Sequence, residues 1–144
     1  MHGAIQPVLD DAVSAFERVL NGRASIYLTG SFVDESANDL SDIDVVVIWA
    51  FEPQRAIVVD ATRRSLRASS GNRLDVMVVS AGDLASPNMA WLIPSLKLAS
   101  RHLAGPDLRG QLRLPGSDEY PPLILERALT ECEPGTGRSQ TRAL

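Results

Sequence analysis

The sequence has little of several residues and patterns that would each point to a particular class of protein. It contains one cysteine, Cys132, so no disulfide can form within the chain. Its two histidines, His2 and His102, are too few and too far apart in the sequence to indicate a zinc site. The 14 basic residues are outnumbered by 18 acidic ones, which argues against a protein that binds nucleic acid through a basic surface.

The chain also lacks a long hydrophobic run. No apolar stretch approaches the roughly 18 residues that are needed to span a membrane. Residues 1–11 carry two acids and lack the basic beginning of a secretory signal peptide. The single cysteine fits a reducing compartment. These absences lead us to expect a cytoplasmic protein with no membrane partner.

What is present is the composition of one folded domain. The chain has 144 residues, of which 44% are hydrophobic and 22% charged. A chain of this size buries about two-thirds of its unfolded surface, which is enough for one ordinary core. We expect a single domain over residues 1–131. Residues 132–144 are polar and rich in proline and glycine, and we expect them to form a disordered tail.

The hydrophobic pattern predicts an alternation of helices and short strands. Apolar residues recur at helical spacing over residues 6–20, and residues 43–49 form an almost wholly apolar, β-branched run typical of a strand buried on both faces. The other expected elements are strands at 24–28 and 74–79, and helices at 53–68, from 86 onward with a break near Pro94, and at 118–131. Residues 101–109 are ambiguous. Because the strands are few and short, we predict an α+β fold in which helices pack on one face of a small sheet.

Two aspartates stand at the start of the apolar strand. Asp42 and Asp44 are two residues apart, so on a strand their carboxylates share one face, roughly 6 to 7 Å apart along the backbone. Such a pair suits a hard cation such as Mg²⁺, which binds one or two carboxylates together with substrate phosphates. The pair alone is not specific, because two acids at the edge of a loop can equally face water. An aspartate beside a buried strand is costly, however, unless it is paired or bound to a metal.

Two further features accompany this pair. Gly30-Ser31 directly follows the first expected strand, where glycine permits close approach of the backbone. It is either a plain turn or the start of a helical turn whose N–H groups, with the Ser31 hydroxyl, bind a phosphate. Asp75 is the lone charge in the third expected strand. It is either an edge-strand acid facing solvent or a third carboxylate of a metal site.

Three basic residues are weaker candidates. Lys97, Arg101 and His102 precede the Gly105-Pro106 pair. They either contact a phosphate or a base, or they are ordinary surface residues.

The order of these features resembles the nucleotidyltransferase superfamily of DNA polymerase β. Gly30-Ser31 is followed after ten residues by Asp42-x-Asp44, then by an apolar run, and later by the isolated strand residue Asp75. The resemblance covers roughly residues 6–80. The segment at 103–108, Leu-Ala-Gly-Pro-Asp-Leu, is similar to the stretch that follows the catalytic strands in the small-molecule branch, which includes aminoglycoside adenylyltransferases.

The resemblance implies a fold, a site and a reaction. The fold is the polymerase β palm-like one, a small mixed sheet flanked by helices. Asp42, Asp44 and Asp75 are implied to be catalytic and to hold two Mg²⁺ ions, and Gly30 and Ser31 to bind the β- and γ-phosphates of a nucleoside triphosphate. The implied reaction is in-line attack of a hydroxyl on the α-phosphorus with release of pyrophosphate. ATP is the commonest donor in the resembling branch.

The sequence departs from that branch after Val79. The remaining stretch is short for the helical domain that usually binds the acceptor and supplies a general base, so we expect a second copy of the chain or another protein to complete the site. The acceptor hydroxyl, on a small molecule, a protein or an RNA, is left open. Three functions compete. They are a metal-dependent nucleotidyltransferase, a minimal antitoxin that binds and sometimes adenylylates a small helical toxin, and a nucleotide-binding relative without turnover.

Overall fold

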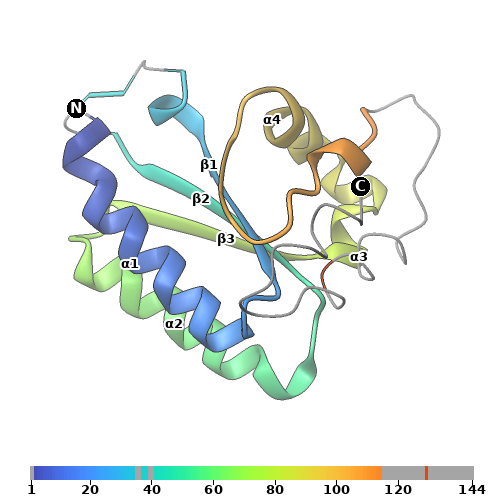
Figure 1. Ribbon diagram of the computed structural model, residues 1–144, viewed down its shortest axis with the longest axis horizontal. Coiled ribbons are helices and arrows are strands. Elements are labelled where there is room, and N and C mark those ends of the chain that lie inside the picture. Colours follow the sequence, from blue (N-terminus) through green and yellow to red (C-terminus); the bar gives the residue numbers. More distant parts are fainter. Residues whose placement is uncertain (1, 35–36, 39–40, 115–128, 130–144) are drawn as a thin grey trace.

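The fold is seen in a computed structural model that describes residues 2–34, 37–38, 41–114 and 129. Figure 1 shows the arrangement of its elements. The helices are α1 (His2–Leu20), α2 (Ala56–Ser69), α3 (Ala81–Leu84) and α4 (Ile93–Leu98). The strands are β1 (Ala24–Thr29), β2 (Ile43–Trp49), β3 (Leu74–Ser80) and β4 (Arg101–Ala104). Short 3-10 turns are η1 (Gly30–Phe32), η2 (Pro53–Arg55), η3 (Pro87–Leu92) and η4 (Arg109–Gln111).

The four strands form one mixed sheet in the order β3-β2-β1-β4. β1 is antiparallel to both β2 and β4, whereas β2 and β3 run parallel. β2 lies inside the sheet and six of its seven residues are buried, which confirms the strand expected at 43–49. The predicted α+β fold, a small mixed sheet flanked by helices, is confirmed.

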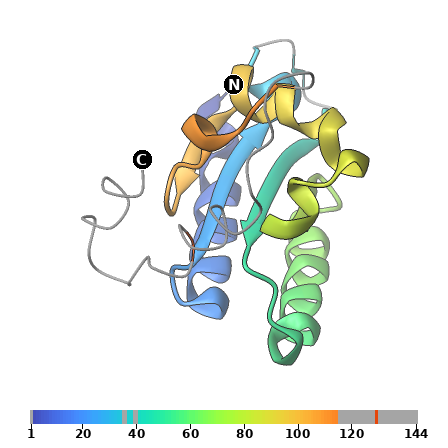
Figure 2. The ribbon, with the colours of Figure 1, turned by 90° about the vertical axis from the view of Figure 1, so that its right-hand side faces the viewer.

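Helices cover both faces of this sheet. α1 and α2 lie side by side on one face, where Phe16 of α1 and Val47 of β2 belong to the larger core cluster. α3, η3 and α4 cover the other face, where Leu84 and Leu96 pack in a second cluster with Ile48 of β2. Figure 2 shows α2 in green below the strands and the α4 segment in gold above them. The expectation of helices on one face alone is wrong, because β2 is apolar on both sides and each side needs a cover.

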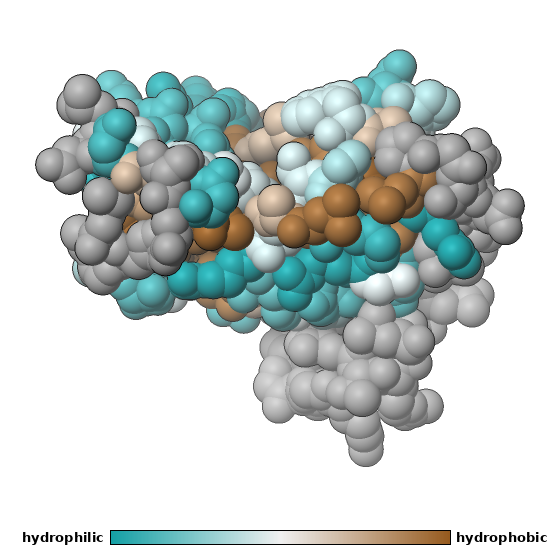
Figure 3. Space-filling view, turned by 90° about the horizontal axis from the view of Figure 1, so that it is seen from above, coloured by the Kyte–Doolittle hydropathy of each residue, from teal (hydrophilic) through white to brown (hydrophobic). Residues whose placement is uncertain are grey.

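Exposed apolar surface is shared between the two layers of helices. Among the described residues, the large apolar side chains that are most exposed are Ile57 on α2 at 83% and Leu98 at the end of α4 at 69%. Seen from above, a band of hydrophobic residues is bordered by hydrophilic ones (Figure 3). No helix in the described part of the chain has the length and apolar character needed to cross a membrane.

The short elements after β3 follow the sequence pattern least closely. α3 was not predicted; its N-cap is Ser80, whose hydroxyl accepts a hydrogen bond from the Asp83 backbone N–H at 3.0 Å. Pro94 lies in the first turn of α4, where a missing N–H costs nothing, and η3 precedes it as a separate turn. The ambiguous stretch 101–109 contains β4, which pairs with β1.

Part of the prediction lies outside the described residues. The helix expected at 118–131, the tail at 132–144 and the domain boundary between them fall there, apart from Leu129, which is buried in the second cluster.

The segment after β4 is fastened to β1 by hydrogen bonds. The Ser25 hydroxyl donates to the Pro106 carbonyl at 2.5 Å, and the backbone N–H of Leu108 donates to the Tyr27 hydroxyl at 2.7 Å. Gly105 makes this approach possible. Its φ is +78°, and a Cβ added there would lie 1.7 Å from the Ala24 carbonyl oxygen.

We expect Gly105→Ala to destabilise the fold far more than Gly71→Ala. Both glycines have a positive φ, which costs alanine about 1 kcal/mol at either position. Gly71 has nothing within 4 Å of the added Cβ, whereas Gly105 must displace the backbone of β1, which should cost about 2 kcal/mol more. Urea unfolding of the two variants measures the difference. Equal losses would show that the Gly105 contact relaxes freely.

Candidate functional site

Two of the predicted acids, Asp44 and Asp75, lie side by side in the sheet. In the strand register Asp44 of β2 lies opposite Asp75 of β3 on one side and Thr29 of β1 on the other. Ile43 and Val45, the neighbours of Asp44, belong to the cluster under α1 and α2, so the Asp44 side chain lies on the opposite face. Neighbouring strands are about 4.8 Å apart, so the two paired aspartates are close neighbours.

The electrostatics of Asp44 reflect this crowding. Burial raises the pKa of its carboxyl above the ordinary value of 3.8, and the charges of Asp75 and then Asp42 raise it further. The charges of both exposed acids, Asp42 and Asp75, therefore act on the partly buried Asp44. A site with this much negative charge favours protons or cations.

Asp75 fits both descriptions left open by the sequence. It lies on the edge strand β3 with 60% of its side chain exposed, and its Oδ1 is 3.7 Å from Nη1 of Arg67 on α2. It is also the direct cross-strand neighbour of Asp44. Asp75 is thus both an exposed acid on an edge strand and a neighbour of the Asp44 carboxylate. Its role as a metal ligand stays a prediction.

The Gly30-Ser31 turn lies against the Asp44 carboxylate. Gly30 has a φ of +79°, and a Cβ built on it would lie 2.5 Å from Oδ2 of Asp44. Only glycine leaves that oxygen accessible at this point. Gly30 also begins the 3-10 turn η1, in which the Val33 N–H donates to the Gly30 carbonyl at 3.0 Å. The turn is helical from Gly30, and Ser31 directly follows the glycine that approaches Asp44.

The donor set suits a hard divalent cation. Carboxylate oxygens are the ligands that Mg²⁺ prefers, and the missing Cβ of Gly30 leaves space beside one of them. Within residues 2–34, 37–38 and 41–114, however, no three histidine, cysteine or acidic side chains converge as a ready metal site. Asp42 and Asp75 are therefore near enough to Asp44 to repel its charge, although the three acids do not form a closed set of ligands. Such carboxylates are expected to draw together as a cation binds.

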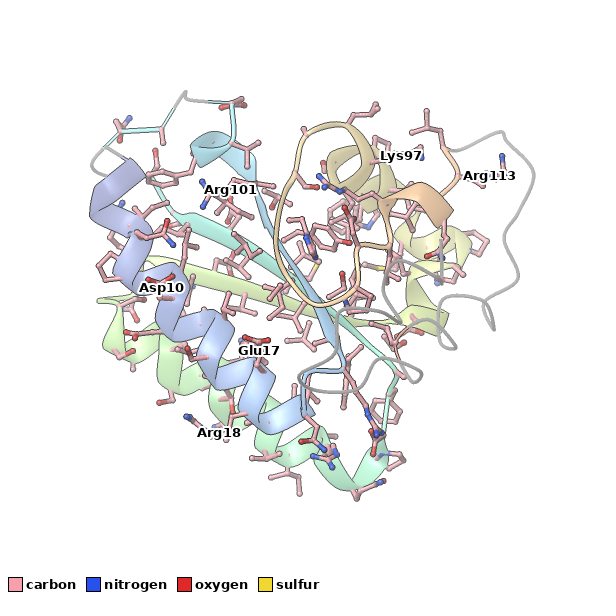
Figure 4. The ribbon with its side chains drawn as sticks, viewed as in Figure 1. Asp10, Glu17, Arg18, Lys97, Arg101 and Arg113 are labelled. Atoms are coloured by element: carbon pink, nitrogen blue, oxygen red, sulfur yellow. The ribbon has the colours of Figure 1, made fainter. Side chains whose placement is uncertain are left out.

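Two of the three weaker basic candidates, Lys97 and His102, have structural partners. Lys97 Nζ donates to the Arg109 carbonyl at 3.0 Å, and His102 Nε2 lies 2.8 Å from the Gly105 carbonyl oxygen. Arg101 is exposed on β4 opposite Leu28. Figure 4 places it near β1 and away from Lys97.

Two arginines near the acids were not singled out from the sequence. Arg67 makes the ion pair with Asp75, and Arg73 stands directly before β3, where its Nη2 donates to the Ser41 carbonyl at 3.3 Å. The only indication of Arg73 in the sequence is its position two residues before the isolated Asp75. Neither position is distinctive in a chain whose basic residues are almost all arginine.

Comparison with known families assigns the chain to one of them. Residues 10–85 match the family described as "Nucleotidyltransferase domain", a span of more than half of the chain that contains all five predicted site residues. The chain therefore belongs to the nucleotidyltransferase domain family, as the resemblance in the sequence implied. Comparison with curated proteins finds no significant match.

A solved structure shares the fold. It is described as "Crystal structure of the toxin-antitoxin with AMP-PNP", and it aligns with a TM-score of 0.50 over 85% of this chain and 83% of that one. The two sequences are 17% identical, so the likeness concerns the fold alone.

The raised pKa of Asp44 predicts that Asp44→Asn stabilises the cation-free protein near neutral pH. A folded-state pKa above the unfolded one means that stability falls as pH rises from the unfolded value towards the folded one. Asparagine carries no charge, so the gain should be present at about pH 7 and absent at about pH 3. Denaturant unfolding in the presence of a chelator, at both pH values, measures it.

Asp60→Asn is the matched control. Hydrogen bonding to Arg63 lowers the pKa of Asp60, so its charge stabilises the protein above its unfolded pKa, and its removal should weaken the fold at about pH 7. Destabilisation by Asp44→Asn at that pH would contradict the electrostatic account of the site.

Proposed function

We propose that the protein is a metal-dependent nucleotidyltransferase that moves a nucleoside monophosphate, AMP from ATP, onto a hydroxyl acceptor. One observation carries the proposal: Asp44 lies in contact range of Gly30 and in register with Asp75. Membership of the nucleotidyltransferase domain family supports the same reading. Phosphoryl and nucleotidyl transfer depend mainly on positioning and charge neutralisation, which this arrangement provides.

Each predicted residue has a task in this reaction. The backbone N–H groups of the Gly30-Ser31 turn and the Ser31 hydroxyl bind the β- and γ-phosphates. Asp42 and Asp44 hold a pair of Mg²⁺ ions, and Asp75 completes the ligand set. Bound Mg²⁺ supplies charge neutralisation for the triphosphate and for the attacking and leaving oxygens.

The transfer itself involves one bond formed and one broken. Asp75 accepts the proton of the acceptor hydroxyl, whose oxygen then bonds to the α-phosphorus. The bond between the α-phosphorus and the bridging oxygen to the β-phosphate breaks, and its electron pair leaves with pyrophosphate. The exposure of Asp75 on the edge strand supports this assignment, because an acceptor can reach it from solvent.

Adenylate is the proposed group because ATP is the commonest donor in the resembling branch. The solved structure of similar fold holds AMP-PNP, which supports an adenine nucleotide. The acceptor class, a small molecule, a protein or an RNA hydroxyl, is for the transfer assay to identify.

Transfer of label from nucleotide to acceptor tests the reaction. The purified protein is incubated with Mg²⁺, each α-labelled nucleoside triphosphate in turn, and lysate split into small-molecule, RNA and protein fractions. Label should enter one fraction from ATP. An Asp42→Asn/Asp44→Asn double variant should lose at least about 10³-fold, because the metal ligands are gone.

Asp60→Asn, which removes one carboxylate charge from α2, should retain full transfer. Undiminished transfer by the double variant would mean that the acids are not the catalytic site.

A second function is favoured by the toxin–antitoxin structure. We propose as the alternative that the protein is an antitoxin-type partner that binds, and can adenylylate, a small helical toxin.

This alternative predicts a stable complex with a small all-helical protein. Co-expression with the product of a neighbouring gene, followed by affinity capture and light scattering, should give a defined hetero-oligomer, and mass spectrometry should find a tyrosine of the partner carrying AMP. A monomer that transfers AMP to a small molecule at full rate without a partner would exclude it. A homodimer that does the same would assign the completing role to a second copy.

A further inference from the structure

Arg73 makes an unusual set of contacts for a residue at the start of an edge strand. Its guanidinium carbon lies 5.8 Å from the centroid of the Phe32 ring, and its Nη2 donates to the Ser41 carbonyl at 3.3 Å. Its own carbonyl accepts a hydrogen bond from the Ile43 N–H at 2.8 Å. Its Nε is buried without a hydrogen-bond partner.

These contacts join the two halves of the nucleotide site. Phe32 is 1% exposed and is the last residue of η1, the turn that begins at Gly30. Ser41 immediately precedes Asp42 and is held in its own turn, where its N–H donates to the Asn38 carbonyl at 3.1 Å. The guanidinium group of Arg73 thus connects the phosphate turn with the segment that carries the acid pair.

The energetics favour a role beyond ordinary surface charge. A buried N–H without a partner costs about 1 to 3 kcal/mol, which stacking on Phe32 offsets only in part. A neutral side chain of similar length would avoid this cost. A planar cation, in contrast, can stack on a ring and donate to a carbonyl at the same time.

We propose that Arg73 is a positioning residue that clamps the η1 turn to the Ser41-Asp42 segment, so that the phosphate-binding and metal-binding halves of the site are aligned before the nucleotide arrives. The proposal rests on the proposed function for its effect on nucleotide binding. The clamp itself is a property of the free protein.

Hydrogen exchange of the cation-free protein tests the clamp directly. The amides of Val33, Ala37 and Ser41 donate to carbonyls within this region and report its local opening. In Arg73→Met they should exchange about tenfold faster, because the cation–ring contact and the hydrogen bond are lost. Arg73→Lys keeps the charge without the planar fork and should recover part of the protection.

Arg64→Met is the matched control, since it removes an exposed arginine from α2, where Arg64 pairs with Asp60. It should leave the amides of the clamp unchanged. Faster exchange of the β1 and β2 amides alone, with Val33, Ala37 and Ser41 as in the native protein, would assign Arg73 a general stabilising role and overturn the proposal.

Nucleotide affinity supplies the second readout. In the presence of Mg²⁺, titration of AMP-PNP should give a dissociation constant about tenfold higher for Arg73→Met than for the native protein, with Arg73→Lys between them. Equal affinity in all three would refute the clamp's part in binding. If the native protein binds no nucleotide, the proposed function fails, while the exchange result still decides whether Arg73 is a clamp.

Discussion

The parallel pairing of β2 with β3 is the constraint on which the site depends. It sets Asp44 opposite Asp75 at the beginning of both strands, and a shift of one residue would turn every side chain of one strand to the other face. The apolar residues fix that register, because Val45 and Val76 must both face the core under α1 and α2. The packing of apolar residues in the core therefore determines where the Asp44 and Asp75 carboxylates lie, although neither residue belongs to the core.

The same arrangement concentrates charge that the fold must tolerate. Asp44 is partly buried with like charges on either side, and its raised pKa is the sign of that cost. The cations nearby are peripheral, since Arg67 reaches Asp75 from an exposed position and Arg73 contacts the backbone at Ser41. Neither arginine neutralises Asp44 directly, so a bound cation would relieve more unfavourable charge at that carboxylate than at Asp75.

The sequence predicted best where burial alone decides the structure. The strand at 43–49 was placed correctly because a run that is apolar at every position except Asp44 must be covered on both sides. Gly30, Asp44 and Asp75 were recognised as a group because their order and spacing resemble a known family. The pattern did not show that Asp44 and Gly30 are in contact, because that depends on the antiparallel pairing of β1 with β2.

The sequence predicted least where the structure depends on contacts between residues that are far apart in the chain. β4 has four residues and no distinctive pattern, and it is a strand only because β1 offers a free edge. Arg73 is ordinary in the sequence, since its importance comes from Phe32 and Ser41, which lie in separate segments. The helical cover of the second face was also missed, because periodicity shows that a strand is buried without showing what buries it.

The attachment of the segment after β4 to β1 also bears on how the chain acquires its structure during synthesis. The bond between Leu108 and Tyr27 spans 81 residues, as does the bond between Ser25 and Pro106. The residues of the proposed nucleotide site all leave the ribosome before Gly105 does. Contacts of such long range close late, since the entropy of the intervening loop must be overcome first. A nascent chain should therefore assemble the face under α1 and α2 early, and the Tyr27 hydroxyl should wait for an interval before it gains its hydrogen bonds to Asp107 and Leu108.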